Sequence, residues 1–199
     1  MGLFNKEYFF GRNSNYKDYR KIKYLGLACD IATILKLDCT KTVLDYGCAT
    51  GCLVKELMSF TPNVFGTDIS QWAIEFGIKQ YKLENNIFPY DKYLLCFPID
   101  YVIMLDVLEH CTNEELRDVF TKINKNKRIK KIVVRIPVSL HEGEDYYLDI
   151  SKNDKTHIQI HCKDQWEKFF KEYGFKFCEA LDYKRIYDSI GVLAWVIGR

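Results

Sequence analysis

Apolar and polar positions follow a repeating order along the chain, in which a short apolar run precedes a segment of helical spacing and then another apolar run. Runs of roughly four to eight apolar residues are typical of strands, and apolar residues three and four positions apart indicate a helix. The predicted strands are 42–46, 64–67, 87–90, 101–105, 131–136, 175–183 and 191–198, and the predicted helices are 16–37, 52–58, 71–82, 113–124 and 163–173.

This alternation of strands and helices predicts an α/β fold with a mostly parallel sheet. Tyr101–Leu105 is fully apolar, as expected for a central parallel strand that is covered on both faces. The last two strands follow one another with no helix between them. They therefore predict an antiparallel edge.

The loop from Asp45 to Gly51, Asp-Tyr-Gly-Cys-Ala-Thr-Gly, lies between the first strand and a helix. Such a loop forms the crevice where α/β sheets hold nucleotides, and glycine lets its backbone approach the ligand closely. Ala49 and Cys52 stand where a dinucleotide fingerprint has its second and third glycines. Asp45 suits a ligand with a cationic amino group better than a diphosphate. The loop therefore favours a nucleotide cofactor other than NAD.

Three more carboxylates follow strands. Asp68 can accept hydrogen bonds from ribose hydroxyls, or it can cap the next helix as Ser70 also can, and its distance from the loop favours ribose. Asp91 accepts a hydrogen bond from an adenine amino group or is an ordinary turn aspartate near Pro89. Asp106 ends the fourth strand at the carboxyl edge of the sheet, where ligands of α/β sheets bind.

Three segments, Val43–Gly51, Val64–Ala73 and Tyr101–His110, together resemble one family. They match, in order, a Leu-Asp-x-Gly-Cys-x-x-Gly, Gly-x-Asp-x-Ser and Leu-Asp-Val-Leu-Glu-His series of the class I S-adenosylmethionine-dependent methyltransferases, in the small-molecule type 11 and type 12 branch. The resemblance implies a Rossmann-like α/β fold with a seven-stranded, mostly parallel sheet, one antiparallel edge strand and helices on both faces. It also implies a single domain over residues 1–199 and S-adenosyl-L-methionine as cofactor.

The same resemblance implies roles for single residues. It places Asp45, Gly47, Cys48, Ala49 and Gly51 around the methionine moiety, Asp68 and Ile69 at the ribose and one adenine face, Asp91 at the adenine amino group, Leu105 and Asp106 near the sulfonium, and His110 near the adenine or the substrate. Ala49 departs from the glycine that is commoner there. Residues 1–37 would form a helical lid over the cofactor, with Tyr16 and Tyr19 as candidates, whereas core packing is favoured for Phe9 and Phe10.

Methyl transfer from a sulfonium needs in-line positioning and, for a poor nucleophile, a general base. The predicted base is His157, because imidazole accepts a proton near neutrality and the segment after the fifth strand forms the acceptor wall in related enzymes. A structural polar contact is an equal alternative for His157. By strand alternation His157 and His161 would share a face, but the spacing fixes no acidic third ligand, so we expect no metal.

The composition limits the class of partner. With 199 residues, 48% hydrophobic and a net charge of +2, the chain is predicted to be a globular domain with no electrostatic case for nucleic acid or membrane. The basic run 122–131 is interpreted as a solvated loop.

Eight cysteines without a Cys-x-x-Cys pair indicate no zinc knuckle and no redox motif. With neither a signal peptide nor an apolar run of about 18 residues, we expect a cytoplasmic protein.

We therefore predict methyl transfer from S-adenosylmethionine to an oxygen or nitrogen of a small-molecule acceptor, with sugars and cell-surface metabolites as one candidate class. An Asn-Pro-Pro-Tyr motif after the fourth strand and a Pro-Cys nucleophile are both absent, which argues against base methylation. One alternative is a non-catalytic S-adenosylmethionine-binding module that serves a partner protein. Another is a nicotinamide-dependent oxidoreductase. The sequence leaves monomer and homodimer open.

Overall fold

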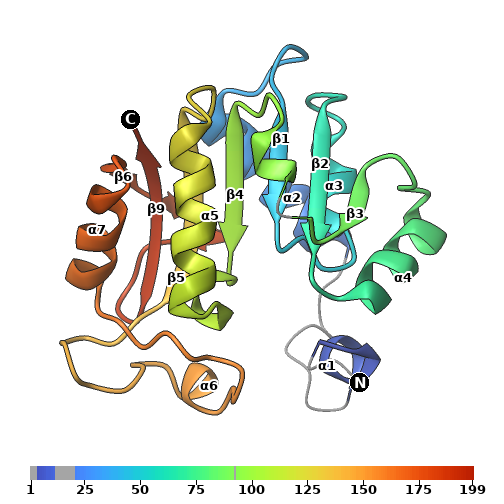
Figure 1. Cartoon of the computed structure of the whole chain (residues 1–199). Coiled ribbons are helices and arrows are strands. Elements are labelled where there is room, and N and C mark those ends of the chain that lie inside the picture. The colour runs from blue at the N-terminus through green and yellow to red at the C-terminus, as the bar shows by residue number, and fades with distance from the viewer. Residues whose placement is uncertain (1–3, 12–20, 92) are drawn as a thin grey trace. The chain divides into compact units, whose positions relative to one another are not determined.

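The computed structural model describes residues 4–11, 21–91 and 93–199, with the side chains of 21–23 excepted. The chain divides into two compact units, 1–92 and 93–199. The elements of the first unit are α1 (Lys6–Phe10), α2 (Lys21–Leu35), β1 (Val43–Tyr46), α3 (Cys52–Leu57), β2 (Val64–Asp68), α4 (Gln71–Tyr81) and β3 (Ile87–Pro89). Those of the second are η1 (Leu94–Cys96), β4 (Tyr101–Leu105), η2 (Leu108–His110), α5 (Asn113–Lys125), β5 (Lys131–Pro137), α6 (Asp149–Lys152), α7 (Lys163–Glu172), β6 (Lys176–Ala180), β7 (Asp182–Tyr183), β8 (Ile186–Tyr187) and β9 (Val192–Gly198) (Figure 1).

The first unit contributes three parallel strands in the order β3-β2-β1. In this register Asp45 lies opposite Gly66, and Asp68 lies opposite Pro89. All four residues of β1 are buried, as its apolar sequence predicts. The parallel register brings the carboxyl ends of these strands to one edge, so that Asp45, near the end of β1, and Asp68, the last residue of β2, are both close to it.

The second unit contributes four strands in the order β4-β5-β9-β6. β5 is parallel to β4, whereas β9 is antiparallel to both of its neighbours, β5 and β6. Helices α5 and α7 lie on one face of these strands, and α6 lies beyond the carboxyl ends of β4 and β5 (Figure 1). The predicted fold class, a seven-stranded, mostly parallel α/β sheet whose antiparallel pairing is at the C-terminal side, is confirmed.

Helix α5 shows how the sequence pattern makes these elements. Thr112 accepts a hydrogen bond from the Glu115 backbone N–H, and the Glu115 carboxylate accepts one from the Thr112 N–H, which forms a capping box. The side chains that helical spacing places on one face are buried, and they are Leu116, Val119, Phe120 and Ile123. The predicted start of this helix is therefore correct.

One predicted strand and one expected strand alternation differ from the structure. The run 175–183 is split, because its pairing with β9 ends at Leu181, whose N–H donates to the Ala194 oxygen, and Asp182 and Tyr183 (β7) pair with β8 instead. The segment 155–161 is not a strand, so the expected strand alternation of His157 and His161 is wrong. The backbone N–H groups of Ile158 and Gln159 both donate to the Glu109 oxygen, which ties this segment to η2 rather than to a strand.

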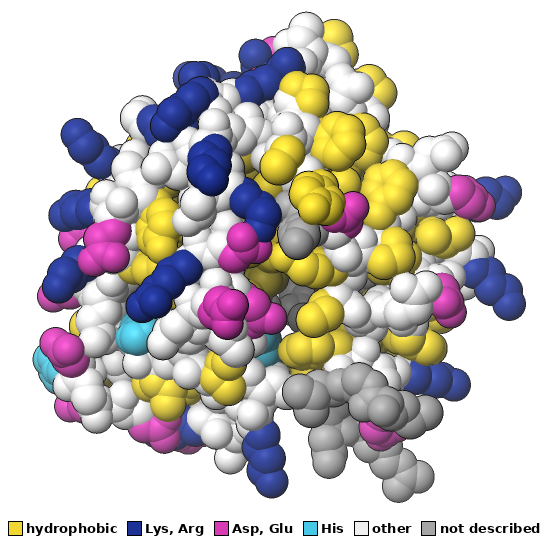
Figure 2. All heavy atoms as spheres, viewed as in Figure 1, with side chains coloured by type: hydrophobic (Ala, Val, Ile, Leu, Met, Phe, Trp, Pro, Cys, Tyr) yellow, Lys and Arg dark blue, Asp and Glu magenta, His cyan; other side chains and the backbone are white. Residues whose placement is uncertain are grey.

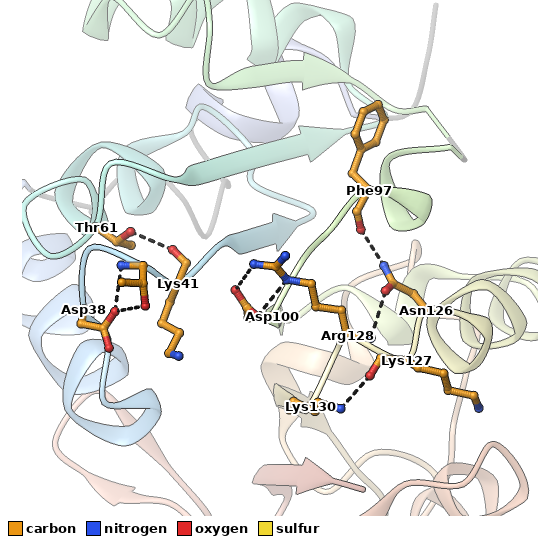
Figure 3. A network of polar contacts seen from close by, with 10 residues as sticks. Asp38, Lys41, Thr61, Phe97, Asp100, Asn126, Lys127, Arg128 and Lys130 are labelled. Carbon is orange, nitrogen blue, oxygen red and sulfur yellow. Dashed lines mark hydrogen bonds and ion pairs between the residues drawn. The ribbon is translucent and has the colours of Figure 1, made fainter.

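The basic run between α5 and β5 forms a hydrogen-bonded turn. Arg128 makes two hydrogen bonds to the Asp100 carboxylate, and Asn126 donates to the backbone oxygen of Phe97 (Figure 3). On the face shown in Figure 2, Lys and Arg side chains are interspersed with Asp and Glu side chains. Within the described residues, no helix has the length and apolar character needed to cross a membrane.

Candidate functional site

The glycine loop of the first unit has a left-handed backbone at three positions. Gly47, Ala49 and Gly51 have φ values of 85°, 49° and 75°. The N–H groups of Gly47 and Cys48 both donate to the Thr67 oxygen, at 2.8 and 3.0 Å, so the loop curls over the end of β2. A non-glycine residue in this conformation costs about 1 kcal/mol, which is why glycine would suit position 49 better than alanine.

Two glycines outside the glycine loop make room for it. A Cβ at Gly66 would lie 2.8 Å from the Cys48 sulfur, and a Cβ at Gly77 would overlap the backbone oxygen of Thr50. Sequence reasoning did not single out either position for this role. A glycine inside a strand and another inside a helix were the available signals, because both places disfavour glycine unless another backbone approaches closely.

Asp68 is bonded directly to the glycine loop. Its Oδ2 accepts a hydrogen bond from the Ala49 N–H at 2.8 Å, and its Oδ1 accepts one from the Ser70 N–H at 2.8 Å. The helix cap is Ser70, whose hydroxyl accepts from the Ala73 N–H. A carboxylate offers about four lone-pair sites, so these two bonds leave Asp68 able to accept hydrogen bonds from ligand hydroxyls.

Asp45 lies under the same loop and is 4% exposed. Burial and, second to it, the charge of Asp68 raise the pKa of Asp45 to about 7. Burial also raises the pKa of Asp68, against the hydrogen bonds from Ser70 and Ala49. The loop therefore concentrates negative charge, which a cationic ligand group would relieve and a diphosphate would worsen.

The remaining predicted cofactor residues of this unit lie at strand ends. Ile69 follows Asp68 and is 65% exposed, so its apolar side chain is available to a ligand ring. Tyr90 donates its backbone N–H to the Asp68 oxygen, and its ring meets that of Tyr46 edge to face. Asp91 follows and is exposed. The adenine role of Asp91 stays a prediction.

The N-terminal segment packs on α4 through aromatic rings. Phe9 is buried and stacks on Trp72 with ring centroids 5.7 Å apart, whereas Phe10 is exposed and meets Trp72 edge to face. The Ser70 hydroxyl donates to the Phe4 oxygen. The burial of Phe9 agrees with core packing, whereas the expectation of core packing is wrong for Phe10, which is 51% exposed. Tyr16 and Tyr19, the predicted lid residues, lie outside the described residues.

In the second unit, Asp106 ends β4 with a left-handed φ of 55°. Its N–H donates to the Arg135 oxygen at 2.8 Å, and its carboxylate lies 3.4 Å from Nη1 of Arg135. Leu105 immediately precedes it and is partly exposed. This strained turn fixes the direction of the Asp106 side chain at the carboxyl end of the strand.

His157 is enclosed by polar and aromatic neighbours. Its side chain is 11% exposed, its ring lies 4.7 Å from that of His110 and 5.3 Å from that of Tyr146, and its Nε2 is 3.7 Å from Oδ2 of Asp154. Burial lowers its pKa. His161 instead contacts Gln159 and Trp166. The general-base role of His157 stays a prediction, and Glu109, which also lies in this region, was missed as a site residue.

The comparisons with known proteins agree with this geometry. Residues 19–180 match a family described as a methyltransferase domain. The chain belongs to this methyltransferase family. The family resemblance predicted from the three motifs is thereby confirmed. No curated protein sequence matches the chain significantly.

Solved structures share the fold at low identity. One is a SAM-dependent methyltransferase from Archaeoglobus fulgidus, with 19% identity, 87% of this chain and 93% of that chain covered, and a TM-score of 0.61. Another is magnesium protoporphyrin IX methyltransferase from Synechocystis PCC 6803 with bound SAH, with 17% identity, 89% and 84% covered, and a TM-score of 0.63. A third, from Haloferax volcanii, is a putative methyltransferase in complex with the Trm112 methyltransferase activator, with 14% identity, 100% and 98% covered, and a TM-score of 0.72.

Proposed function

We propose that the chain transfers a methyl group from S-adenosylmethionine to an oxygen or nitrogen of a small-molecule acceptor. The observation that carries this proposal is the pair of carboxylates at the glycine loop, Asp45 buried beneath it and Asp68 hydrogen-bonded to Ala49. S-adenosylmethionine brings a cationic amino group and a sulfonium, whereas a dinucleotide brings a diphosphate. The loop charge therefore favours the first and opposes the second.

The residues present fit this cofactor. Asp45 would attract the methionine amino group, Asp68 would accept hydrogen bonds from the ribose hydroxyls, and the exposed Ile69 would pack on the adenine. Gly47 and Gly51 hold backbone conformations that keep side chains away from the ligand. When bound, the cofactor supplies an electrophilic methyl group, and the protein has to orient the acceptor in line with it.

The segment between β5 and α7 is the proposed acceptor wall. It is tied down by Tyr146, which is buried and donates its hydroxyl to the Gln159 oxygen at 2.9 Å. Several of its apolar side chains are nevertheless exposed, namely Leu140, Tyr147, Ile150, Ile158 and Ile160. An ordered segment with exposed apolar side chains is suited to an acceptor that has an apolar portion.

A non-catalytic or partner-dependent role is the second candidate. β6 lies at the edge of the sheet in its unit, its five residues are exposed, and Phe177 is among them. An exposed edge strand is a surface on which another chain can add a strand. In the Haloferax volcanii structure, a putative methyltransferase of similar fold is in complex with a methyltransferase activator.

The deciding experiment measures S-adenosylhomocysteine formation. Wild type and Asp68→Ala would be incubated with S-adenosylmethionine and pooled acceptors, in separate reactions for small molecules, RNA, DNA and protein. We expect product only in the small-molecule pools and only with wild type. Product from the nucleic-acid or protein reactions would overturn the acceptor class. Cofactor binding without product in any reaction would favour the non-catalytic module.

A further inference from the structure

The side-chain carboxyl of Glu109 is buried without a hydrogen-bond partner among the described residues. Its side chain is completely buried, and neither of its oxygens has a hydrogen-bond partner among the described residues. Its backbone oxygen, in contrast, accepts hydrogen bonds from the N–H groups of Ile158 and Gln159. Burying a polar group without a partner is costly, and in native proteins nearly all such groups are paired. The position therefore needs a physical explanation.

Two imidazole rings lie beside this carboxyl. The side-chain ligand atoms of Glu109, His110 and His157 all lie within 4.8 Å of one another. His157 also has a buried Nδ1 that forms no well-aligned hydrogen bond among the described residues, although the Ser151 backbone is close enough to act on its pKa. The cluster forms because the backbone bonds from Ile158 and Gln159 hold the histidine segment against η2. The unpartnered carboxyl and this ring nitrogen thus lie at the same place.

The surrounding contacts orient these rings. The Thr156 hydroxyl and backbone oxygen lie 2.9 and 3.2 Å from Nδ1 of His110, and Thr156 is itself held by two hydrogen bonds to Asp154. Asp154 also lies 3.7 Å from His157. A hydrogen bond at one ring nitrogen and a carboxylate behind the ligands are typical of metal-binding histidines. Burial lowers the pKa of both histidines, which favours the neutral rings that bind metals.

We propose that Glu109, His110 and His157 bind one divalent transition-metal ion. Two imidazoles and one carboxylate are a donor set of zinc and iron sites, with remaining positions open to water or substrate. Magnesium and calcium prefer all-oxygen ligands and fit this set less well. All three ligands belong to the second unit, so the site does not rest on the proposed methyl transfer.

The competing explanation is a neutral carboxyl. Burial, reinforced by the charge of Asp106, raises the pKa of Glu109 well above its ordinary value. If the Glu109 carboxyl stays protonated, it does not coordinate a metal ion. In that case Glu109→Gln should have little effect on folding. Metal binding and a general-base role also exclude one another for His157, because a coordinated ring nitrogen has no lone pair for a proton.

The test uses the metal alone as probe. The full chain, stripped with a chelator and with its thiols blocked by N-ethylmaleimide, would be titrated with Zn²⁺, Co²⁺ and Mg²⁺ by calorimetry, and the visible spectrum of Co²⁺ would report its coordination. Blocking is needed because Cys29, Cys39, Cys96 and Cys178 are exposed thiols. The variants are Glu109→Gln, His157→Gln and the control His161→Gln, whose ring contacts Gln159 outside the cluster.

We expect wild type and His161→Gln to bind one Zn²⁺ or Co²⁺ per chain, and the bound ion to raise their melting temperature. Glu109→Gln and His157→Gln should bind the ion at least 10-fold more weakly. Failure of the folded wild type to bind either ion overturns the proposal, as does equal binding by Glu109→Gln. If Glu109→Gln does not fold, His157→Gln, which keeps the carboxyl, decides. Neither readout requires methyl transfer, so loss of the proposed function would leave this test unchanged.

Discussion

The glycine loop of the first unit and the Glu109 cluster of the second unit reach their geometry in different ways. The loop is continuous in sequence. Its shape follows from the left-handed backbone of its glycines and from the hydrogen bond that the Ala49 N–H donates to Asp68. The cluster joins residues more than 40 positions apart, through backbone bonds to the Glu109 oxygen. A contiguous motif can be recognised in the sequence, whereas a cluster assembled by a long segment requires the structure.

The largest effect on the loop side of this comparison is expected from Gly77→Ala. The new methyl group would overlap the Thr50 oxygen, so α4 or the loop must move, at a cost of about 3 kcal/mol of unfolding free energy. The control Gly143→Ala has no atom within 4 Å and loses only about 1 kcal/mol, from its φ of +83°. Urea denaturation measures both. Equal losses would mean that α4 does not press on the loop.

Asp68→Asn should weaken the binding of S-adenosylhomocysteine by about 10- to 100-fold, since charge-assisted hydrogen bonds to two hydroxyls are lost. Its stability should change little, because asparagine can still accept one of the two backbone hydrogen bonds. Glu84→Gln is the matched control, an exposed carboxyl of the same unit to which no cofactor contact is assigned. Calorimetry gives both affinities. If the two variants lose the same affinity, Asp68 has no special part in ribose binding.

Asp45 links stability and ligand binding to pH in opposite directions. Its folded pKa of about 7 lies above its ordinary value of 3.8, so its contribution to stability is fully present below pH 3.8 and is lost as pH rises to about 7. Asp45→Asn should therefore stabilise the ligand-free protein by roughly 2 to 3 kcal/mol more at pH 8 than at pH 5. Urea midpoints at the two pH values measure this.

Binding should show the reverse dependence. The ionised Asp45 attracts a cationic ligand group, so the affinity for S-adenosylmethionine should rise between pH 6 and pH 8 in wild type and stay flat in Asp45→Asn. A wild-type affinity that does not change over this range would show that Asp45 does not face the cationic part of the ligand.

The smallest effect is expected in the second unit from Tyr146→Phe. The variant removes one buried hydrogen bond, to the Gln159 oxygen, and should cost about 1 kcal/mol of unfolding free energy. Hydrogen exchange of the segment 155–161 should rise more than that of β5. Unchanged exchange there would mean that the Tyr146 hydroxyl does not anchor the acceptor wall.

The sequence predicted most of the strands and helices that carry an uninterrupted apolar pattern. Tyr101–Leu105 and the start of α5 at Asn113 were predicted to the residue, because burial on both faces and a capping box leave a local signal. The split of 175–183 was missed, since it arises where the pairing partner changes from β9 to β8, and an apolar pattern does not tell which strand a residue pairs with. Whether the chain forms one domain, as expected, stays a prediction.

The residues of the candidate site likewise fall into those that the sequence could predict and those that it could not. Asp45, Gly47, Gly51 and Asp68 could be named from their order alone, and the structure places them around one loop. Glu109 could not be recognised, because the motif Leu-Asp-Val-Leu-Glu-His does not tell that its carboxyl is buried without a partner. His157 was noted for its chemistry, but its neighbours Asp154 and Thr156 follow from a loop conformation that no spacing rule predicts.

Calorimetric titration of the wild-type chain at pH 8 with S-adenosylmethionine and, separately, with NAD tests the central claim most directly. The charge and geometry of the glycine loop predict binding of S-adenosylmethionine with a dissociation constant of about 10 μM, corresponding to roughly 7 kcal/mol, and no measurable binding of NAD. Tighter binding of NAD, or no heat from S-adenosylmethionine in a folded sample, would contradict the account.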